Sequence, residues 1–336
     1  MKRLGIGFIV AVFAFAVIGC RNKEEDEGKM KLVVIKVVPG SASTTAREKG
    51  FMETVEEKYS GTMVVVDSRY GMSDRAKSLA VSEDLLTAHP DLNGIFAANE
   101  SSAVGALEAV KARGLSRRVR VVGFDSSPSL EEAVKDRTID SLVVQAPFHI
   151  GYEAVKTIVD KLNGKTPPKR IETKATLITR GNINSAEVQR LLHPDIKKYL
   201  QKEGEVTSGE GKKTIAVIPK SQAHIFWQTV HAGAIAAGLD LGVKVLWKAP
   251  ATEIDYNEQV RIVEDFLTQK VDGIVLAPTD RKALVPYIER AAKEGIPLTI
   301  FDSGADTDAY ISFVATDNYQ GGVMAADRMA EILGAK

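Results

Sequence analysis

The 336-residue sequence has a single cysteine, few aromatic residues (6%) and no net charge. One cysteine excludes an intramolecular disulfide framework and any zinc site built from cysteines. The balance of 44 basic against 44 acidic residues argues against a protein whose main partner is nucleic acid or an anionic membrane surface. With 44% hydrophobic and 26% charged residues, the composition is that of a folded α/β protein. At about 100–200 residues per domain, a chain of this length is expected to form about two domains.

The lone cysteine, Cys20, follows an apolar run that is too short to cross a membrane. The run extends from Gly5 to Ile18 behind Lys2 and Arg3, whereas a membrane-spanning helix needs about 20 apolar residues. A basic start and a short apolar stretch that ends in a small residue are typical of an export signal. Because Cys20 occupies the position after the expected cut, residues 1–20 resemble a bacterial lipoprotein signal, in which the cysteine thiol receives the lipid. A plain secretory signal is the alternative.

Residues 21–30 form a charged segment that we interpret as an acidic tether. Removal of the signal would take away two basic residues and no acidic residue, so the mature chain would have a formal charge of −2. We expect this chain to be exported to the cell envelope and anchored by lipid, on the periplasmic side of a membrane or on the outer face of the cell membrane.

The rest of the sequence alternates short β-branched runs with longer amphipathic stretches, which is typical of βαβ units and a parallel sheet. The predicted strands are Leu32–Val38, Met63–Asp67, Gly94–Ala97, Val119–Phe124, Ile139–Gln145, Thr214–Pro219, Lys244–Lys248, Gly273–Leu276, Leu298–Phe301 and Ile311–Ala315. The predicted helices are Thr44–Tyr59, Ser73–Ala88, Ser102–Arg113, Ile150–Asn163, Phe226–Gly238, Tyr256–Gln269, Lys282–Glu294 and Tyr319–Leu333.

One pattern occurs twice along the chain. The segment Leu92–Asn99 matches Val271–Pro278, and about the same number of residues later each copy has a strand that ends in Phe-Asp-Ser. This repeat predicts two similar α/β lobes. Ligands of open α/β sheets bind outside the carboxyl ends of the strands. Two facing lobes would therefore bring Asp125 and Asp302 into one cleft from opposite walls.

These segments together resemble the type I periplasmic sugar-binding proteins, the ribose-binding-like solute receptors of ABC importers. The resemblance implies two Rossmann-like lobes with parallel sheets, joined by a hinge of three crossing strands. The segments that carry it are Ile215–Trp227, Val271–Pro278, Phe301–Ser303, Phe313–Gly322, Gly40–Gly50, Ala97–Ser101, Val122–Asp125 and Val143–Pro147.

The order of the segments departs from that of the family. There, the part that resembles Thr214–Lys336 comes first and the part that resembles Lys31–Thr179 follows it. The resemblance therefore implies a circularly permuted chain, with the family's original ends joined through the polar stretch His193–Lys213. In such a chain Lys29 and Lys336 are expected to lie close together in space.

The same matching divides the chain into parts. The three hinge crossings are expected near Thr316, Gln145–Ala146 and Thr173–Thr176. The parts are the signal (1–20), the tether (21–30), lobe II (31–145 plus 317–336), lobe I (146–175 plus 213–316), and a hinge return and linker (176–212).

A sugar presents hydroxyl groups on a ring with apolar faces, so its site needs carboxylates, amides, an arginine and aromatic side chains. The residues that match the family's site in this way are Phe226, Trp227, Asp302, Arg47, Asn99, Asp125 and Gln145, with Lys220, His224, Ser303 and Tyr70 as further candidates. The family's ribose binders have asparagine in place of His224 and arginine in place of Ser303. These two departures leave the identity of the sugar open.

The first seven of these residues also have a plain structural interpretation. Asp125, Asp302 and Asn99 could cap helices or shape turns. Arg47 could be a solvated helix residue, and Gln145 could stand at an ordinary strand exit. Phe226 and Trp227 could belong to the core of a lobe.

No catalytic pattern stands out. The five histidines form no HExxH motif and no close pair with metal-ligand spacing, and there is no GxSxG, Walker A or GxGxxG motif. We expect no enzymatic activity, no metal and no cofactor.

The resemblance implies a monomeric substrate-binding lipoprotein that closes around a monosaccharide or related polyol and delivers it to an ABC permease in the membrane. Two alternatives remain. One is a receptor that senses a ligand for a membrane histidine kinase or chemoreceptor, and the other, from a different class, is a lipid-anchored hydrolase. Nucleic acid is not an expected partner, because the chain begins with an export signal and no basic helix-turn-helix follows it.

Overall fold

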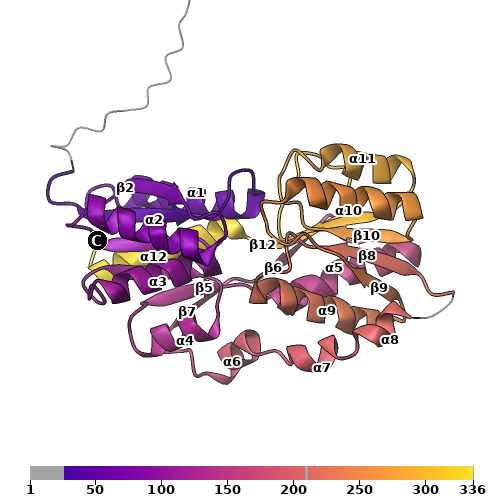
Figure 1. The fold of residues 1–336 in the computed structure, drawn as a ribbon, viewed down its shortest axis with the longest axis horizontal. Coiled ribbons are helices and arrows are strands. Elements are labelled where there is room, and N and C mark those ends of the chain that lie inside the picture. Colours follow the sequence, from indigo (N-terminus) through magenta and orange to yellow (C-terminus); the bar gives the residue numbers. More distant parts are fainter. Residues whose placement is uncertain (1–25, 209–210, 336) are drawn as a thin grey trace, which may run out of the picture.

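A computed structural model describes residues 26–208 and 211–335, which fold into two lobes that lie side by side (Figure 1). The predicted signal, with Cys20, and the first half of the predicted tether lie outside the described residues. Each lobe contains one six-stranded sheet. The α/β class and the two parallel-sheet lobes predicted from the sequence are confirmed.

Lobe II is built on the sheet β2-β1-β3-β4-β5-β7. Its strands are β1 (Met30–Lys36), β2 (Met63–Tyr70), β3 (Gly94–Ala97), β4 (Arg120–Phe124), β5 (Ser141–Val144) and β7 (Thr176–Thr179), and its helices are α1 (Ala42–Lys58), α2 (Arg75–Ala88), α3 (Glu100–Ala112), α4 (Pro128–Lys135), α6 (Ala186–Leu192) and α12 (Asn318–Leu333).

Lobe I is built on the sheet β6-β12-β11-β10-β8-β9. Its strands are β6 (Arg170–Thr173), β8 (Thr214–Ile218), β9 (Lys244–Trp247), β10 (Gly273–Leu276), β11 (Leu298–Phe301) and β12 (Ser312–Thr316), and its helices are α5 (Pro147–Leu162), α7 (Ile196–Leu200), α8 (Glu203–Thr207), α9 (Ile225–Leu241), α10 (Tyr256–Gln269) and α11 (Val285–Lys293).

The two sheets repeat one topology. Read from one edge, the lobe II sheet has the order β2, β1, β3, β4, β5, β7, and the lobe I sheet has the order β9, β8, β10, β11, β12, β6. The two orders match strand for strand, and β6 takes the last place in lobe I although it comes earlier in the chain. All pairings are parallel except that of β7 with β5. The interior strands β3 and β10 are buried along their whole length, which explains their continuous apolar sequences.

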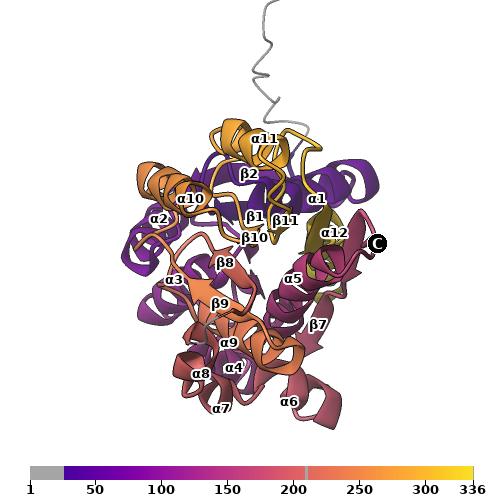
Figure 2. The same ribbon diagram turned by 90° about the vertical axis from the view of Figure 1, so that its right-hand side faces the viewer.

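In lobe I, α5 and α9 cover one face of the sheet, and α10 and α11 cover the other (Figure 2). Two pairs of helices come unusually close, α5 with α9 in lobe I and α1 with α12 in lobe II. Glycines allow this approach, because a Cβ atom on Gly151 or Gly233 would collide with the backbone of the facing helix, and the same holds for Gly50 and Gly322. The chain reaches α5 from lobe II and α12 from lobe I, so both helices follow crossings between the lobes. At the crossing, the Thr173 and Thr316 hydroxyls are hydrogen-bonded at 3.0 Å.

Residues 176–207 pack more extensively than a polar linker would. Val188 and Leu191 of α6 pack against the core of lobe II, and Val206 of α8 is buried against the core of lobe I. The strand β7 completes the lobe II sheet. The sequence patterns missed β6 and β7, which are four-residue edge strands with little burial, and the helices α4, α6, α7 and α8, which are only five to eight residues long.

The two ends of the described chain meet at lobe II. Met30 and Ala335 pack against the same apolar cluster beneath α1 and α12, while Lys336 lies outside the described residues. Within residues 26–208 and 211–335, no helix combines the length and apolar character that a membrane span requires.

Substitution of Gly233 by alanine is expected to destabilise lobe I. The new Cβ atom would lie against the carbonyl oxygen of Phe148 in α5, so the helices must separate, at a cost of about 1–3 kcal/mol. The matched control is Gly61→Ala, where a Cβ atom meets nothing within 4 Å. Urea unfolding of both variants measures the difference, and equal midpoints for the two would contradict the packing account.

Candidate functional site

The carboxyl ends of the strands in the two lobes face each other across a cleft. The cleft has a free volume of about 30 Å³, enough for one or two water molecules. It is lined by Ser43, Thr44, Arg47, Asn99, Glu100, Asp125 and Gln145 from lobe II and its exit to the hinge, and by Lys220, His224, Phe226, Trp227, Glu253 and Asp302 from lobe I.

Asp125 and Asp302 occupy equivalent positions in the two lobes. Each follows the last residue of a strand, β4 or β11, and adopts a left-handed backbone conformation, with φ of 63° and 56°. Each backbone N–H donates to the neighbouring strand, to Val143 O at 2.8 Å and to Val314 O at 2.9 Å. Non-glycine residues in this conformation are strained and concentrate at functional sites.

The helix-capping alternative is wrong for both aspartates. Ser127 is the residue that precedes α4, and the element after Asp302 is the strand β12. For Asn99 the capping alternative is confirmed, because its Oδ1 accepts a hydrogen bond from the Ser102 N–H at 2.9 Å. Asn99 lines the cleft as well, and its Nδ2 donates to Ser73 Oγ at 3.2 Å.

In lobe II, Asp125 is held by Arg47 and Gln145. The Arg47 guanidinium lies 3.5 Å from Asp125 Oδ2, and Gln145 Nε2 donates to Asp125 Oδ1 at 2.8 Å. Burial raises the pKa of Asp125, while Arg47 and then Gln145 act against that rise. Arg47 is only 2% exposed, so the alternative of a solvated helix residue is wrong.

Further contacts fix the position of Arg47. Its Nε donates to Asn318 Oδ1 at 2.7 Å and its Nη1 to the carbonyl of Ala98 at 2.9 Å. The guanidinium also stacks over the Phe124 ring, 3.8 Å from the ring centroid. Arg47 therefore ties α1, the end of β3 and the start of α12 together beneath the cleft.

In lobe I, Asp302 is held by Lys220. The Lys220 ammonium lies 2.8 Å from Asp302 Oδ2. It also donates across the cleft to Ser41 Oγ at 3.1 Å and to Ser43 Oγ at 3.0 Å. This buried ion pair thus belongs to one lobe and is bonded to the other.

His224 makes a second polar contact between the lobes. Its Nε2 lies 3.3 Å from Ser73 Oγ, and its Nδ1 lies 3.7 Å from Glu100 Oε2. Glu100 also forms an ion pair with Arg75 of α2. The Arg75 contact gives a cation to a carboxylate that would otherwise be buried without one.

Trp227 is both a core residue and a wall of the cleft. It is 3% exposed, its ring meets those of Phe226 and Phe301 edge to face, and its Nε1 donates to Glu253 Oε1 at 2.8 Å. Phe226 and Trp227 thus pack in the core of lobe I, as the core interpretation predicted, and also line the cleft.

Two buried acceptors in the cleft have no hydrogen-bond partner among the described residues, Gln145 Oε1 and Thr44 Oγ1. A buried polar atom that is left unpaired costs about 1–3 kcal/mol. In this cleft the Gln145 amide oxygen can accept a hydrogen bond, and the Thr44 hydroxyl can accept or donate one. The part of the chain that the structure describes contains no group of His, Cys, Asp and Glu side chains that could hold a metal ion.

Nine of the eleven residues predicted for the ligand site line this cleft. Ser303 is buried beside it, where its Oγ accepts from the Ser43 N–H at 3.2 Å. Tyr70 lies outside the cleft at the end of β2, with Lys36 over its ring. Four further residues line the cleft without having been predicted from the sequence, namely Ser43, Thr44, Glu100 and Glu253. The first three are neighbours of predicted site residues, whereas no sequence signal points to Glu253.

Comparison with known proteins identifies the family. The model of the periplasmic binding protein domain matches residues 19–166 and 215–336. The chain belongs to this family, and the type I periplasmic sugar-binding class inferred from the sequence is confirmed.

Curated relatives match over part of their length. The ribose import binding protein of Bacillus subtilis (strain 168) is 35% identical over 150 residues, which is 45% of this chain and 47% of the relative. The corresponding protein of Escherichia coli (strain K12) is 34% identical over 159 residues, or 47% of this chain and 52% of the relative. The chain thus spans about half the length of the curated relatives it matches.

Among solved structures, the chain is similar to a carbohydrate transporter solute-binding protein of Agrobacterium radiobacter, in complex with D-arabinose. That similarity has a TM-score of 0.48 and 33% identity, over 49% of this chain and 56% of the other. A solute-binding protein of Agrobacterium vitis with bound α-D-tagatopyranose gives a TM-score of 0.48 and 29% identity, over 51% and 57% of the two chains.

Replacement of Lys220 by methionine is expected to destabilise the protein by about 3 kcal/mol, because Asp302 would remain buried without its cation. Adding Asp302→Asn to that variant should restore part of the loss, since the unpaired charge is then gone. Lys282→Met, at an exposed lysine of lobe I, is the control and should change stability by less than about 0.5 kcal/mol. Denaturant unfolding tests this, and equal stabilities for the two lysine variants would refute the buried pair.

Proposed function

We propose that this protein is the substrate-binding component of an ABC importer and that it binds a monosaccharide or a related polyol in the cleft. The observation that carries the proposal is the composition of the cleft wall. Carboxylates, amides, hydroxyls and two cations surround two aromatic rings, which is the set of groups that a polyhydroxylated ring requires. The unpaired Gln145 Oε1 and Thr44 Oγ1 supply acceptors for ligand hydroxyls.

The small free volume of the cleft supports a closing movement of the lobes. About 30 Å³ cannot admit a sugar ring, so the lobes must open before a ligand enters. The contacts between the lobes at the cleft are polar, and they include those of Lys220 with Ser41 and Ser43, that of His224 with Ser73 and those of Ser43 with Ser303 and Asp302. The carbonyl groups of Pro39 and Gly40 also accept hydrogen bonds from Tyr256 and Arg281 of lobe I. A ligand that bonds to both lobes at once would replace these contacts and favour the closed state.

The names of the curated relatives also support a sugar as the ligand. Their names specify ribose and, for other curated relatives, D-allose and D-apiose. His224 and Lys220 add a ring nitrogen and an ammonium group to the wall of the cleft, so we propose a polyhydroxylated ligand without committing to ribose.

We further propose that Cys20 carries a lipid anchor and that the chain order is circularly permuted relative to the family. The shared packing of Met30 and Ala335 on one cluster supports the second point, because β1 could then follow α12 directly. A sensor that presents the same closed state to a membrane kinase remains the alternative within this fold.

Calorimetric titration with D-ribose, D-allose and D-arabinose tests the proposal. We expect at least one of these sugars to bind, and Asp125→Asn or Asp302→Asn to weaken its binding by about 100-fold, because each removes a charged acceptor that is worth about 1.5–3 kcal/mol per hydrogen bond. The matched control, Asp84→Asn on the exposed side of α2, should bind as the unchanged protein does. Binding that survives in both cleft variants would place the ligand elsewhere.

A further inference from the structure

A second, larger hollow lies on lobe II at the edge of the sheet opposite the cleft. Its volume is about 870 Å³. It is bordered by the first residue of β4 (Arg120), the residue before β5 (Asp140), and the end of β7, which runs antiparallel to β5. Parallel strands begin at one edge and end at the other, so this hollow and the sugar cleft lie at opposite edges of one sheet.

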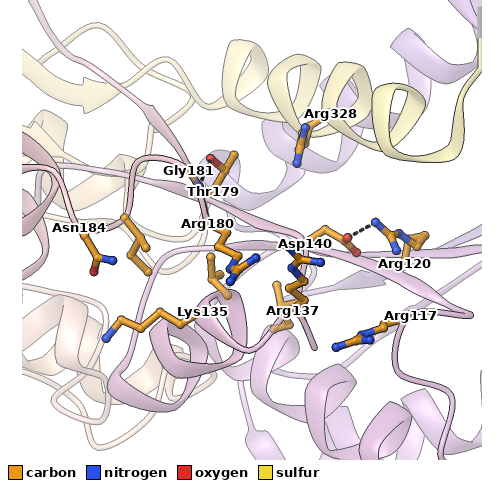
Figure 3. A pocket seen from close by; sticks show the side chains of 13 residues that line it. Arg117, Arg120, Lys135, Arg137, Asp140, Thr179, Arg180, Gly181, Asn184 and Arg328 are labelled. Atoms are coloured by element: carbon orange, nitrogen blue, oxygen red, sulfur yellow. Dashed lines mark hydrogen bonds and ion pairs between the residues drawn. The ribbon is translucent and has the colours of Figure 1, made fainter.

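Cationic side chains dominate the lining of the hollow. Figure 3 shows Arg120, Arg137 and Arg180 around Asp140, with Arg328 directed toward them from α12. The complete set of lining cations is Arg117, Arg120, Lys135, Arg137, Arg180 and Arg328, against one carboxylate, that of Asp140.

The neighbouring carboxylates neutralise only part of this charge. Asp140 forms an ion pair with Arg120 at 2.5 Å, and Lys135 and Arg328 pair with glutamates of their own helices at 2.6 and 2.7 Å. The exposed side chains of Arg117, Arg137 and Arg180 form no ion pair or hydrogen bond within residues 26–208 and 211–335. Arg137 and Arg180 therefore have no carboxylate partner, and Arg117 has only the nearby carboxylate of Asp136, so positive charge remains available in the hollow.

Two buried donors in the hollow also lack acceptors. The Nε atoms of Arg120 and Arg328 are buried and have no hydrogen-bond partner among the described residues. A guanidinium N–H that is buried without an acceptor is unfavourable, and both of these guanidinium groups border the hollow.

The choice of residue points to a particular kind of anion. Lysine is the commoner cation in the whole sequence, with 27 lysines and 17 arginines, yet five of the six cations here are arginines. The planar guanidinium bonds phosphate oxygens in pairs, which lysine cannot do. Arg117 and Arg137 also occupy left-handed backbone positions, with φ of 73° and 67°, where glycine would be less strained.

We propose that this hollow is a binding site for a phosphate-type group, carried either by the headgroup of an anionic lipid or by a soluble phosphorylated molecule. The lipid headgroup is the expected source, because β1 begins at this same edge of the sheet. The chain therefore enters β1 at the edge of lobe II where the hollow lies, and the choice of a lipid as the source rests on the proposed anchor at Cys20.

Calorimetric titration of the full chain at low salt tests the site. The two probes are pyrophosphate and dihexanoyl-phosphatidylglycerol below its micelle concentration, and dihexanoyl-phosphatidylcholine serves as the zwitterionic comparison. We expect binding of phosphatidylglycerol that falls steeply with added salt, and no binding of phosphatidylcholine. If both anionic probes bind, or pyrophosphate alone, the hollow is still an anion-binding site, and its ligand is then a soluble phosphorylated molecule and not a lipid.

The double variant Arg137→Glu/Arg180→Glu should weaken this binding by about tenfold or more, since both side chains are exposed and the fold does not depend on them. The matched control, Lys282→Glu/Lys293→Glu, makes the same change of net charge at exposed lysines of lobe I and should change the affinity less than about twofold. If neither anionic probe binds, or if the two double variants weaken binding equally, the site does not exist. Sugar binding in the double variant serves as the check that lobe II is folded.

Discussion

The cleft depends on two buried ion pairs, Asp125 with Arg47 and Asp302 with Lys220. Each carboxylate follows the end of a buried strand, where desolvation disfavours its charge unless a cation lies beside it. In lobe II the cation comes from α1 of the same lobe. In lobe I the cation also bonds to serines of the other lobe, so the pair that stabilises one wall also ties the two walls together. A ligand that reaches Asp302 must therefore act on the contacts that hold the lobes closed.

The repeated topology explains why the two aspartates face each other. In both lobes an interior strand ends in the same Phe-Asp-Ser motif, and the aspartate adopts a left-handed conformation. Since the carboxyl ends of both sheets border the cleft, an internal repeat becomes a site with two similar halves. The halves differ in their other groups. Lobe II contributes mainly polar and charged side chains, while lobe I contributes the aromatic pair Phe226 and Trp227.

Much of the fold and the cleft could be predicted because they depend on local patterns. Apolar runs marked the central strands, and the repeat located Asp125 and Asp302. Glu253 could not be predicted, because only tertiary folding brings its loop to Trp227. Tyr70 lies outside the cleft because β2 is the edge strand of its sheet. The overall charge of zero was also a poor guide, since it averages over a strongly cationic hollow at the far edge of lobe II.

The most direct test of a cleft that closes on its ligand is the distance between the lobes, measured by double electron–electron resonance. Spin labels at Lys77→Cys, near the start of α2, and at Thr252→Cys, next to Glu253, report on opposite sides of the cleft. Cys20→Ala removes the only other thiol. The account predicts a broad distribution of distances without sugar and a shorter, narrower one with the tightest-binding sugar. An unchanged distribution at saturating sugar would contradict it.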